Sequence, residues 1–161
     1  MKRPSQIISG MLVAAALLAG CATTPPPAPL PETAARLPEL STFTRLVDQA
    51  GLADTLRGTG PYTVFAPSDE AFKAVPAKTM AELAANKELL KSVLSYHVLP
   101  GSVTSDHVKT GPAKTLQGAS ATLGAAGTFM TVDEAVVQKA DIVATNGVVQ
   151  VVDRVLMPPK K

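Results

Sequence analysis

The chain has 161 residues, of which 46% are hydrophobic and 17% charged, a composition that excludes wholesale disorder and allows one ordinary domain with appendages. Lys2 and Arg3 account for the formal net charge of +2, because the other 13 basic residues match the 13 acidic ones. The rest of the chain therefore has no excess of positive charge, which is the feature that would indicate a nucleic-acid partner.

The N-terminus has the pattern of a bacterial signal peptide. Lys2 and Arg3 precede an apolar stretch of about 12 residues, Ile7 to Leu18, which is shorter than the roughly 20 residues of a membrane-spanning helix. The segment ends Leu18-Ala19-Gly20-Cys21, which resembles the lipobox of bacterial lipoproteins. In that family the cysteine thiol receives a lipid, and cleavage leaves the cysteine as the first residue. We expect residues 1–20 to be a lipoprotein signal peptide and Cys21 to be the lipid attachment site.

Cys21 is the only cysteine of the chain, which excludes an internal disulfide. The next residue is Ala22, whereas Gram-negative lipoproteins retained at the inner membrane often have Asp there. The resemblance thus implies a lipid-anchored protein of the cell envelope and, in a Gram-negative host, one at the outer membrane that faces the periplasm or the surface. Two alternatives are an ordinary signal peptide with a coincidental cysteine and an N-terminal anchor helix.

Residues 21–37 are predicted to be the lipidated cysteine and a Pro-rich tether. Five prolines fall within residues 25–31, and proline fixes φ and removes backbone donors, so we expect an extended, semi-rigid spacer. A motif for a Pro-binding partner is the alternative. No internal repeat is visible, and one domain is predicted over residues 38–158.

The first half of that domain is predicted to be mainly helical. Ser41 is expected to cap a helix with apolar residues at a 3.6-residue period, and Ser68 to cap a second helix with acids in its first turn. The first helix is predicted over 41–50, and its apolar face continues through Leu52, Ala53 and Leu56 after an interruption at Gly51. The other predicted elements are a helix that starts at 67–70, helices over 79–84 and 87–94, and a strand over 62–65.

The second half is predicted to be mainly strands. Beyond Pro100-Gly101, short segments rich in Val, Thr and Ala alternate with glycines, and Asn146-Gly147 before Val148–Val152 is a hairpin signal. Helices followed by strands favour an α+β fold.

Three segments together resemble the fasciclin (FAS1) domain, in order and in spacing. They read TVFAPSDEAF from Thr63, YHVLPG from Tyr96 and NGVVQVVDRVLMP from Asn146. The resemblance implies a fasciclin-like α+β fold, with the helices of the first half packed on a β-sandwich-like or wedge-like sheet. Gln150 stands where the family often has His, which weakens any case for a ligand or metal role there.

The resemblance also implies an adhesion or protein-interaction module whose partner is an envelope or extracellular protein or glycan. Tyr96, His97 and Pro100 are the candidate binding residues, because the Tyr-His pair has been linked to adhesion in this family and an apolar patch there would suit a contact. For His97 we favour a structural role, as a buried ring that pins a helix to the following strand.

No catalytic or metal site is indicated. His97 and His107 are the only histidines and do not belong to a cluster with ligand spacing, and Gly118–Thr122 lacks the second glycine of a nucleophile elbow. We expect no enzyme and no cofactor, and we expect Asp153 to accept hydrogen bonds from a turn. The alternative function is a carrier of an apolar small molecule, a lipid or carotenoid, in a groove between helices and sheet.

Overall fold

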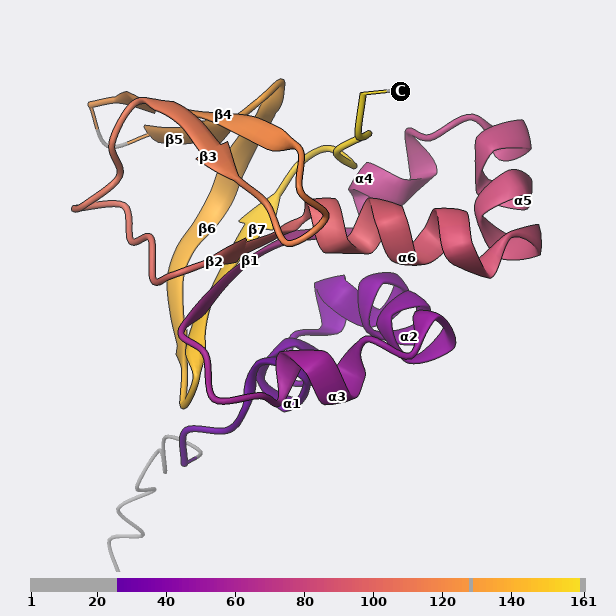
Figure 1. Cartoon of the computed structure of the whole chain (residues 1–161), viewed down its shortest axis with the longest axis horizontal. Coiled ribbons are helices and arrows are strands. Elements are labelled where there is room, and N and C mark those ends of the chain that lie inside the picture. The colour runs from indigo at the N-terminus through magenta and orange to yellow at the C-terminus, as the bar shows by residue number, and fades with distance from the viewer. Residues whose placement is uncertain (1–25, 128, 160–161) are drawn as a thin grey trace, which may run out of the picture.

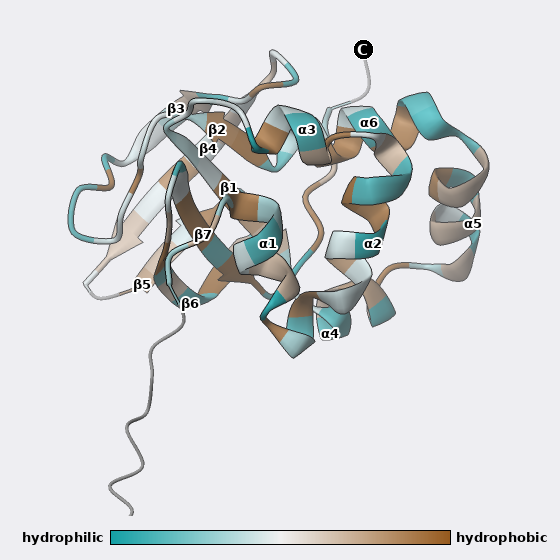
Figure 2. Cartoon of the chain, turned by 90° about the horizontal axis from the view of Figure 1, so that it is seen from below, coloured by the Kyte–Doolittle hydropathy of each residue, from teal (hydrophilic) through white to brown (hydrophobic). Residues whose placement is uncertain are grey.

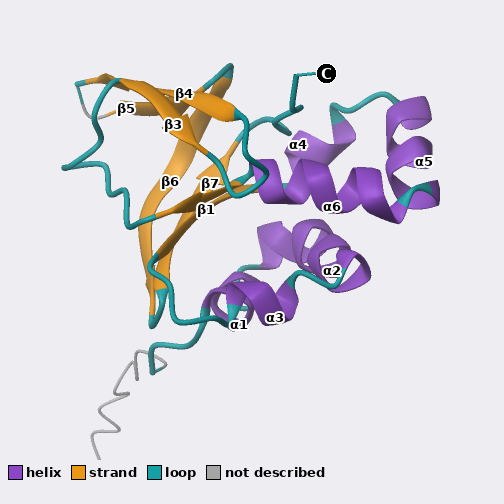
Figure 3. Cartoon of the chain, in the orientation of Figure 1, coloured by secondary structure: helices purple, strands orange, loops and turns teal. Residues whose placement is uncertain are grey.

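The computed structural model describes residues 26–127 and 129–159, so the predicted signal peptide and Cys21 lie outside the described residues. Helices fill the first half and strands the second, as predicted (Figures 1 and 3). The helices are α1 (Leu30–Ala35), the short 3-10 helix η1 (Pro38–Leu40), α2 (Ser41–Ala50), α3 (Ala53–Leu56), α4 (Asp69–Lys73), α5 (Ala77–Ala85) and α6 (Lys87–Tyr96). The strands are β1 (Tyr62–Pro67), β2 (Val98–Pro100), β3 (Gly111–Lys114), β4 (Ser120–Ala126), β5 (Phe129–Val132), β6 (Ala135–Ala144) and β7 (Gly147–Val152).

The strands form one sheet in the order β2-β1-β7-β6-β5-β4-β3. β1 and β7 are parallel, with Tyr62 opposite Gly147 at one end and Pro67 opposite Val152 at the other, and the remaining neighbours are antiparallel. Parallel strands covered on both faces have near-continuous apolar sequences. This explains why β1 and β7 are buried over five consecutive residues each.

Two hydrophobic clusters cover the two faces of the central strands. Because successive side chains of a strand point to opposite faces, Val64 enters the cluster beneath the helices and Phe65 the cluster beneath β4 and β5. The helices supply the first cluster from one apolar face each, which Figure 2 shows as brown and teal alternating along α2 and α6. The α+β prediction is confirmed.

The two predicted helix caps differ in outcome. Ser68 caps α4, because its Oγ accepts a hydrogen bond of 3.3 Å from the Ala71 N–H, as predicted. Ser41 opens α2 without capping it. Its Oγ instead donates to Asp69 Oδ2 at 2.7 Å, while Asp69 Oδ1 accepts the Thr42 N–H at 2.8 Å. The prediction for Ser41 was wrong because a carboxylate distant in sequence reaches that free amide first.

The stretch predicted as an extended spacer is only partly extended. Within the described residues, Pro26–Pro29 are outside any helix, but α1 begins at Leu30 and buries Leu30 and Ala34, which are 1% and 3% exposed. Pro31 fits because the first turn of a helix needs no partner for its N–H groups. The Pro-rich residues after Leu30 therefore belong to the packed domain.

Asn146 holds α1 against the sheet at the turn between β6 and β7, where the predicted hairpin is present. Its side-chain Oδ1 accepts the Leu30 N–H at 3.0 Å, and its Nδ2 donates to the carbonyls of Leu56 and Gly58 at 2.6 and 2.8 Å. The neighbouring Gly147 lies so close to β1 that a Cβ there would be 2.0 Å from the Tyr62 carbonyl oxygen. The Asn-Gly pair thus joins three segments as well as forming a turn.

Candidate functional site

His97 is buried in the centre of the domain, with 0% of its surface exposed. Its Nδ1 lies 2.8 Å from the Val93 carbonyl and its Nε2 accepts the Leu156 N–H at 2.9 Å. Because a carbonyl can only accept and an N–H only donate, Nδ1 carries the proton and the ring is neutral. Burial lowers the pKa of His97 to about 4, which keeps the ring in that form. The favoured structural role agrees with this geometry, but the ring pins α6 to the C-terminal segment rather than to the following strand.

Tyr96 is also buried, with 3% of its surface exposed, and its ring packs in the cluster beneath β4 and β5. Its hydroxyl donates to Asp133 Oδ2 at 2.8 Å and lies 3.2 Å from the Ser120 carbonyl. Burial and the bond to Asp133 raise the pKa of Tyr96 to about 12. The tyrosine therefore fixes the β5–β6 turn to α6.

Pro100 is the exposed member of the three candidate binding residues, at the end of β2 opposite Tyr62. With Tyr96 and His97 buried, the three do not form the apolar surface patch that the sequence suggested. Direct contact with a partner at this place stays a prediction for Pro100 alone. The other two side chains act inside the fold.

A polar cluster that the sequence analysis missed surrounds Gln150, which is fully buried. Gln150 Nε2 donates to the Val103 carbonyl at 3.1 Å and to Asp141 Oδ1 at 3.0 Å, and its Oε1 accepts the Asp141 N–H at 2.9 Å. Ser105 donates to the same carboxylate from its N–H, at 2.9 Å, and from its hydroxyl. Burial alone would raise the pKa of Asp141, but the bonds from Ser105 and Gln150 hold it below its ordinary value.

This cluster binds the loop after β2 to the bulged middle of β6, where Asp141 has a φ of 58°. It is satisfied from within the chain, so it explains the buried polar residue at position 150 without a ligand. No group of three or more His, Cys, Asp or Glu among the described residues is arranged to hold a metal ion. Asp153 accepts the Val136 N–H at 2.8 Å, so its carboxylate bonds to strand β6 and not to a turn as expected.

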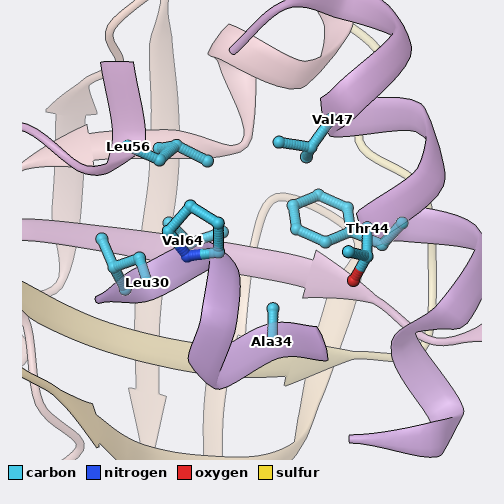
Figure 4. A pocket seen from close by; sticks show the side chains of 8 residues that line it. Leu30, Ala34, Thr44, Val47, Leu56 and Val64 are labelled. Carbon is cyan, nitrogen blue, oxygen red and sulfur yellow. The ribbon is translucent and has the colours of Figure 1, made fainter. Parts of the chain in front are cut away.

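The space between the helices and the sheet is almost filled. Figure 4 shows Leu30, Ala34, Val47 and Leu56 converging on it, and its volume is ≈ 10 Å³. A cavity of this size holds about one water molecule. This pocket is therefore too small for the lipid or carotenoid of the alternative carrier function.

A larger hollow lies on the outer surface, between α5, α6 and the C-terminal residues 153–158. Its volume is ≈ 690 Å³, which is within the range of about 300–1,000 Å³ typical of ligand sites. We call it the distal groove. Within the described residues, no helix has the length and apolar character needed to cross a membrane.

Comparison with known proteins identifies the fold independently of the motifs. Residues 38–158 match the model of the fasciclin domain. The FAS1 domain pair of the insect cell adhesion molecule fasciclin I superposes with a TM-score of 0.64 at 18% identity, over 81% of this chain and 51% of that chain. The predicted fasciclin-like fold is confirmed.

Three relatives are similar along most of the chain. Protein sll1483 of Synechocystis sp. is 40% identical, over 80% of this chain and 72% of that protein. Immunogenic protein MPB70 of Mycobacterium bovis is 42% identical, over 81% and 69%. Cell surface glycolipoprotein MPB83 of the same species is 38% identical, over 81% and 61%.

The match to the fasciclin domain supports the expectation that the chain is not an enzyme. The domain model matches residues 38–158, and the three relatives and the shared fold each cover about four-fifths of the chain. The chain belongs to the fasciclin domain family.

Proposed function

We propose that this chain is a lipid-anchored fasciclin-domain protein of the bacterial cell envelope that serves as an adhesion or protein-interaction module. The observation that carries the proposal is the similarity to the cell surface glycolipoprotein MPB83, combined with the lipobox-like Leu18–Cys21 of this chain. Fold alone does not decide function, so the anchor and the partner each need evidence of their own.

The anchor is Cys21, after removal of residues 1–20. Residues 22–29 then form the short link to the domain, and the domain proper runs to Pro158. The link joins the domain at a fixed position beside the β6–β7 turn, because the Ala28 carbonyl accepts the Thr145 N–H there at 2.9 Å. In Figure 1 the described chain begins, in indigo, beside that end of the sheet. An anchored domain would therefore have a preferred orientation relative to its membrane.

The partner is an envelope or extracellular protein or glycan. A membrane-anchored, non-catalytic domain whose interior is packed on both faces of the sheet acts through its surface. The distal groove has the largest volume of the five hollows compared on the described part of the chain. The carrier alternative draws no support from an interior cavity of ≈ 10 Å³. Anchoring and surface binding together make the chain an interaction module.

A deletion strain of the native host tests this function. Its attachment to surfaces and to neighbouring cells should fall, and the full chain should restore attachment. The Cys21→Ser chain should be made but should not restore it, since a released domain cannot join its partner to the membrane. Unchanged attachment in the deletion strain, together with no envelope component bound by the purified chain, would remove the basis of the proposal.

A further inference from the structure

The distal groove has the make-up of a protein contact site. Its floor includes Leu83 and Val93, which are 1% and 3% exposed, and its rims carry Leu89 and Met157, which are 39% and 44% exposed. Single exposed apolar side chains are ordinary, but two that face a common apolar hollow indicate a binding surface. Met157 adds a flexible side chain of the kind that adapts to different partners.

The groove lies at the far end of the domain from the N-terminal link. The link is bound at the Tyr62/Gly147 end of the parallel pair β1 and β7, whereas α4 and residue 153 follow the Pro67/Val152 end. Six-residue strands separate the two ends by roughly 17–20 Å. Figure 1 shows the first described residues, in indigo, and the C-terminus on opposite sides of the molecule. A domain anchored through Cys21 would turn the groove away from its own membrane.

Charges of opposite sign flank the apolar floor. Glu82 is exposed on α5, and the C-terminal wall carries the half-buried Asp153 and the exposed Arg154, which lies 3.8 Å from Glu134. Glu82 and Leu89 also line a second hollow over the turn between α5 and α6, so the depression continues beyond the groove. An elongated apolar surface with a charge at each side selects an occupant of matching length and charge order.

We propose that the distal groove binds an apolar peptide segment of a second envelope protein, with a basic residue beside Glu82 and an acidic residue beside Arg154. The inference rests on the proposed interaction function and names its surface. An occupant from the anchoring membrane is disfavoured, because the groove faces away from it.

His97 is the positioning residue of this groove. Leu156 is 4% exposed and points into the cluster beneath β4 and β5, and its N–H is held by His97. In extended chain, neighbours of an inward residue point outward, which places Val155 and Met157 on the groove wall. The other ring nitrogen binds the carbonyl of Val93, a residue of the groove floor. The buried ring thus joins wall to floor without touching an occupant.

Site-specific photo-crosslinking in the native envelope tests the surface. The photoreactive residue p-benzoyl-L-phenylalanine replaces Thr79 or Leu89 of the full chain in the groove, and Val143, which is 69% exposed near the β6–β7 turn, as the control. The expected result is one protein adduct from positions 79 and 89 and none from 143. Glu82→Lys should lower the yield about tenfold, and an acidic replacement of the facing basic residue in the captured partner should restore it.

The outcomes separate this inference from the function on which it rests. A protein adduct from position 143 alone would overturn the groove and leave the interaction function standing. No protein adduct from any position would overturn both. A lipid adduct from positions 79 and 89 would overturn the peptide occupant.

A test of the positioning role of His97 must separate that role from a general loss of domain stability. His97→Leu removes both ring bonds and should lower the adduct yield at position 89, whereas His97→Gln, whose amide can donate and accept, should restore part of it. Tyr96→Phe weakens the domain but leaves the bond to Leu156, so it should keep the full yield. Equal losses in Tyr96→Phe and His97→Leu would overturn the positioning role.

Discussion

The imidazole of His97 accepts the backbone N–H of Leu156 at 2.9 Å, across 59 residues of sequence. With the bond from the other ring nitrogen to the Val93 carbonyl, this bond fixes the C-terminal segment of the domain to α6 and gives the fully buried histidine a partner on each side. The bond exists only while Nε2 is unprotonated, so it links the stability of the domain to pH.

Acid should destabilise the domain through this residue. The unfolded chain binds a proton near the ordinary pKa of 6.5, but the folded chain does so only near pH 4. The unfolded state therefore holds more protons between these values, and the free energy of unfolding should fall as pH falls, by at most about 1.4 kcal/mol per unit. Urea unfolding at pH 7.0, 5.5 and 4.5 measures this fall in the free energy of unfolding.

His97→Gln is the control, since it removes this titration but retains the carboxylates that also respond to acid. The stability of the variant should depend less steeply on pH than that of the natural chain. Parallel curves for the two proteins would show that His97 does not titrate with a lowered pKa.

Tyr96→Phe should cost about 1 kcal/mol, because it removes the hydroxyl bond to Asp133 and leaves the ring packed. Thermal unfolding should show a melting temperature lower by roughly 2–6 °C. Tyr62→Phe is the matched control, since the Tyr62 hydroxyl makes no hydrogen bond to the described residues. A larger loss from Tyr62→Phe than from Tyr96→Phe would refute the assignment.

Asn146→Ala should release α1 from the sheet. The change leaves the Leu30 N–H and the carbonyls of Leu56 and Gly58 without their partner, at a cost of roughly 2–4 kcal/mol. Hydrogen exchange should show faster exchange of the Leu30 amide than in the natural chain. Asn86→Ala, which removes the cap of α6, should cost about 1 kcal/mol and leave the Leu30 amide protected.

Gly147→Ala should prevent the correct pairing of β1 with β7. Its Cβ would lie 2.0 Å from the Tyr62 carbonyl oxygen, so one of the two central strands must move. Gly51→Ala tests backbone conformation alone: at a φ of +70° with no atom within 4 Å, it should cost about 1–2 kcal/mol. Circular dichroism and denaturant unfolding compare the two, and similar losses would contradict the close approach.

Local sequence signals identified the helices and strands because each signal acts within a few residues of its own position. Ser68 caps a helix whose acids lie in its first turn, and Asn146-Gly147 turns a hairpin. In contrast, the capping of α2 by Asp69 and the burial of Gln150 beside Asp141 depend on residues that meet only in the folded chain. Asp69 lies 27 residues from Thr42. Gln150 lies only nine residues from Asp141, but the loop residues Val103 and Ser105 that complete its cluster lie 47 and 36 residues from their partners.

The candidate site shows the same division. The motif around Tyr96 and His97 was singled out for binding, and the structural role favoured for His97 agrees with its burial after an apolar helix. Its connection to Leu156 did not follow, because the closing segment docks from 59 residues away. The distal groove could not be predicted from the sequence for the same reason, since Leu83, Leu89 and Met157 come from three separate segments.

The central claim, a fasciclin domain anchored through Cys21, is tested most directly by metabolic labelling with radioactive palmitate. The natural chain should be labelled and should sediment with membranes, since two or three acyl chains bind a bilayer stably. Cys21→Ser should be unlabelled and should stay in the soluble fraction after its signal peptide is removed. Label that persists on the Cys21→Ser chain would contradict the account.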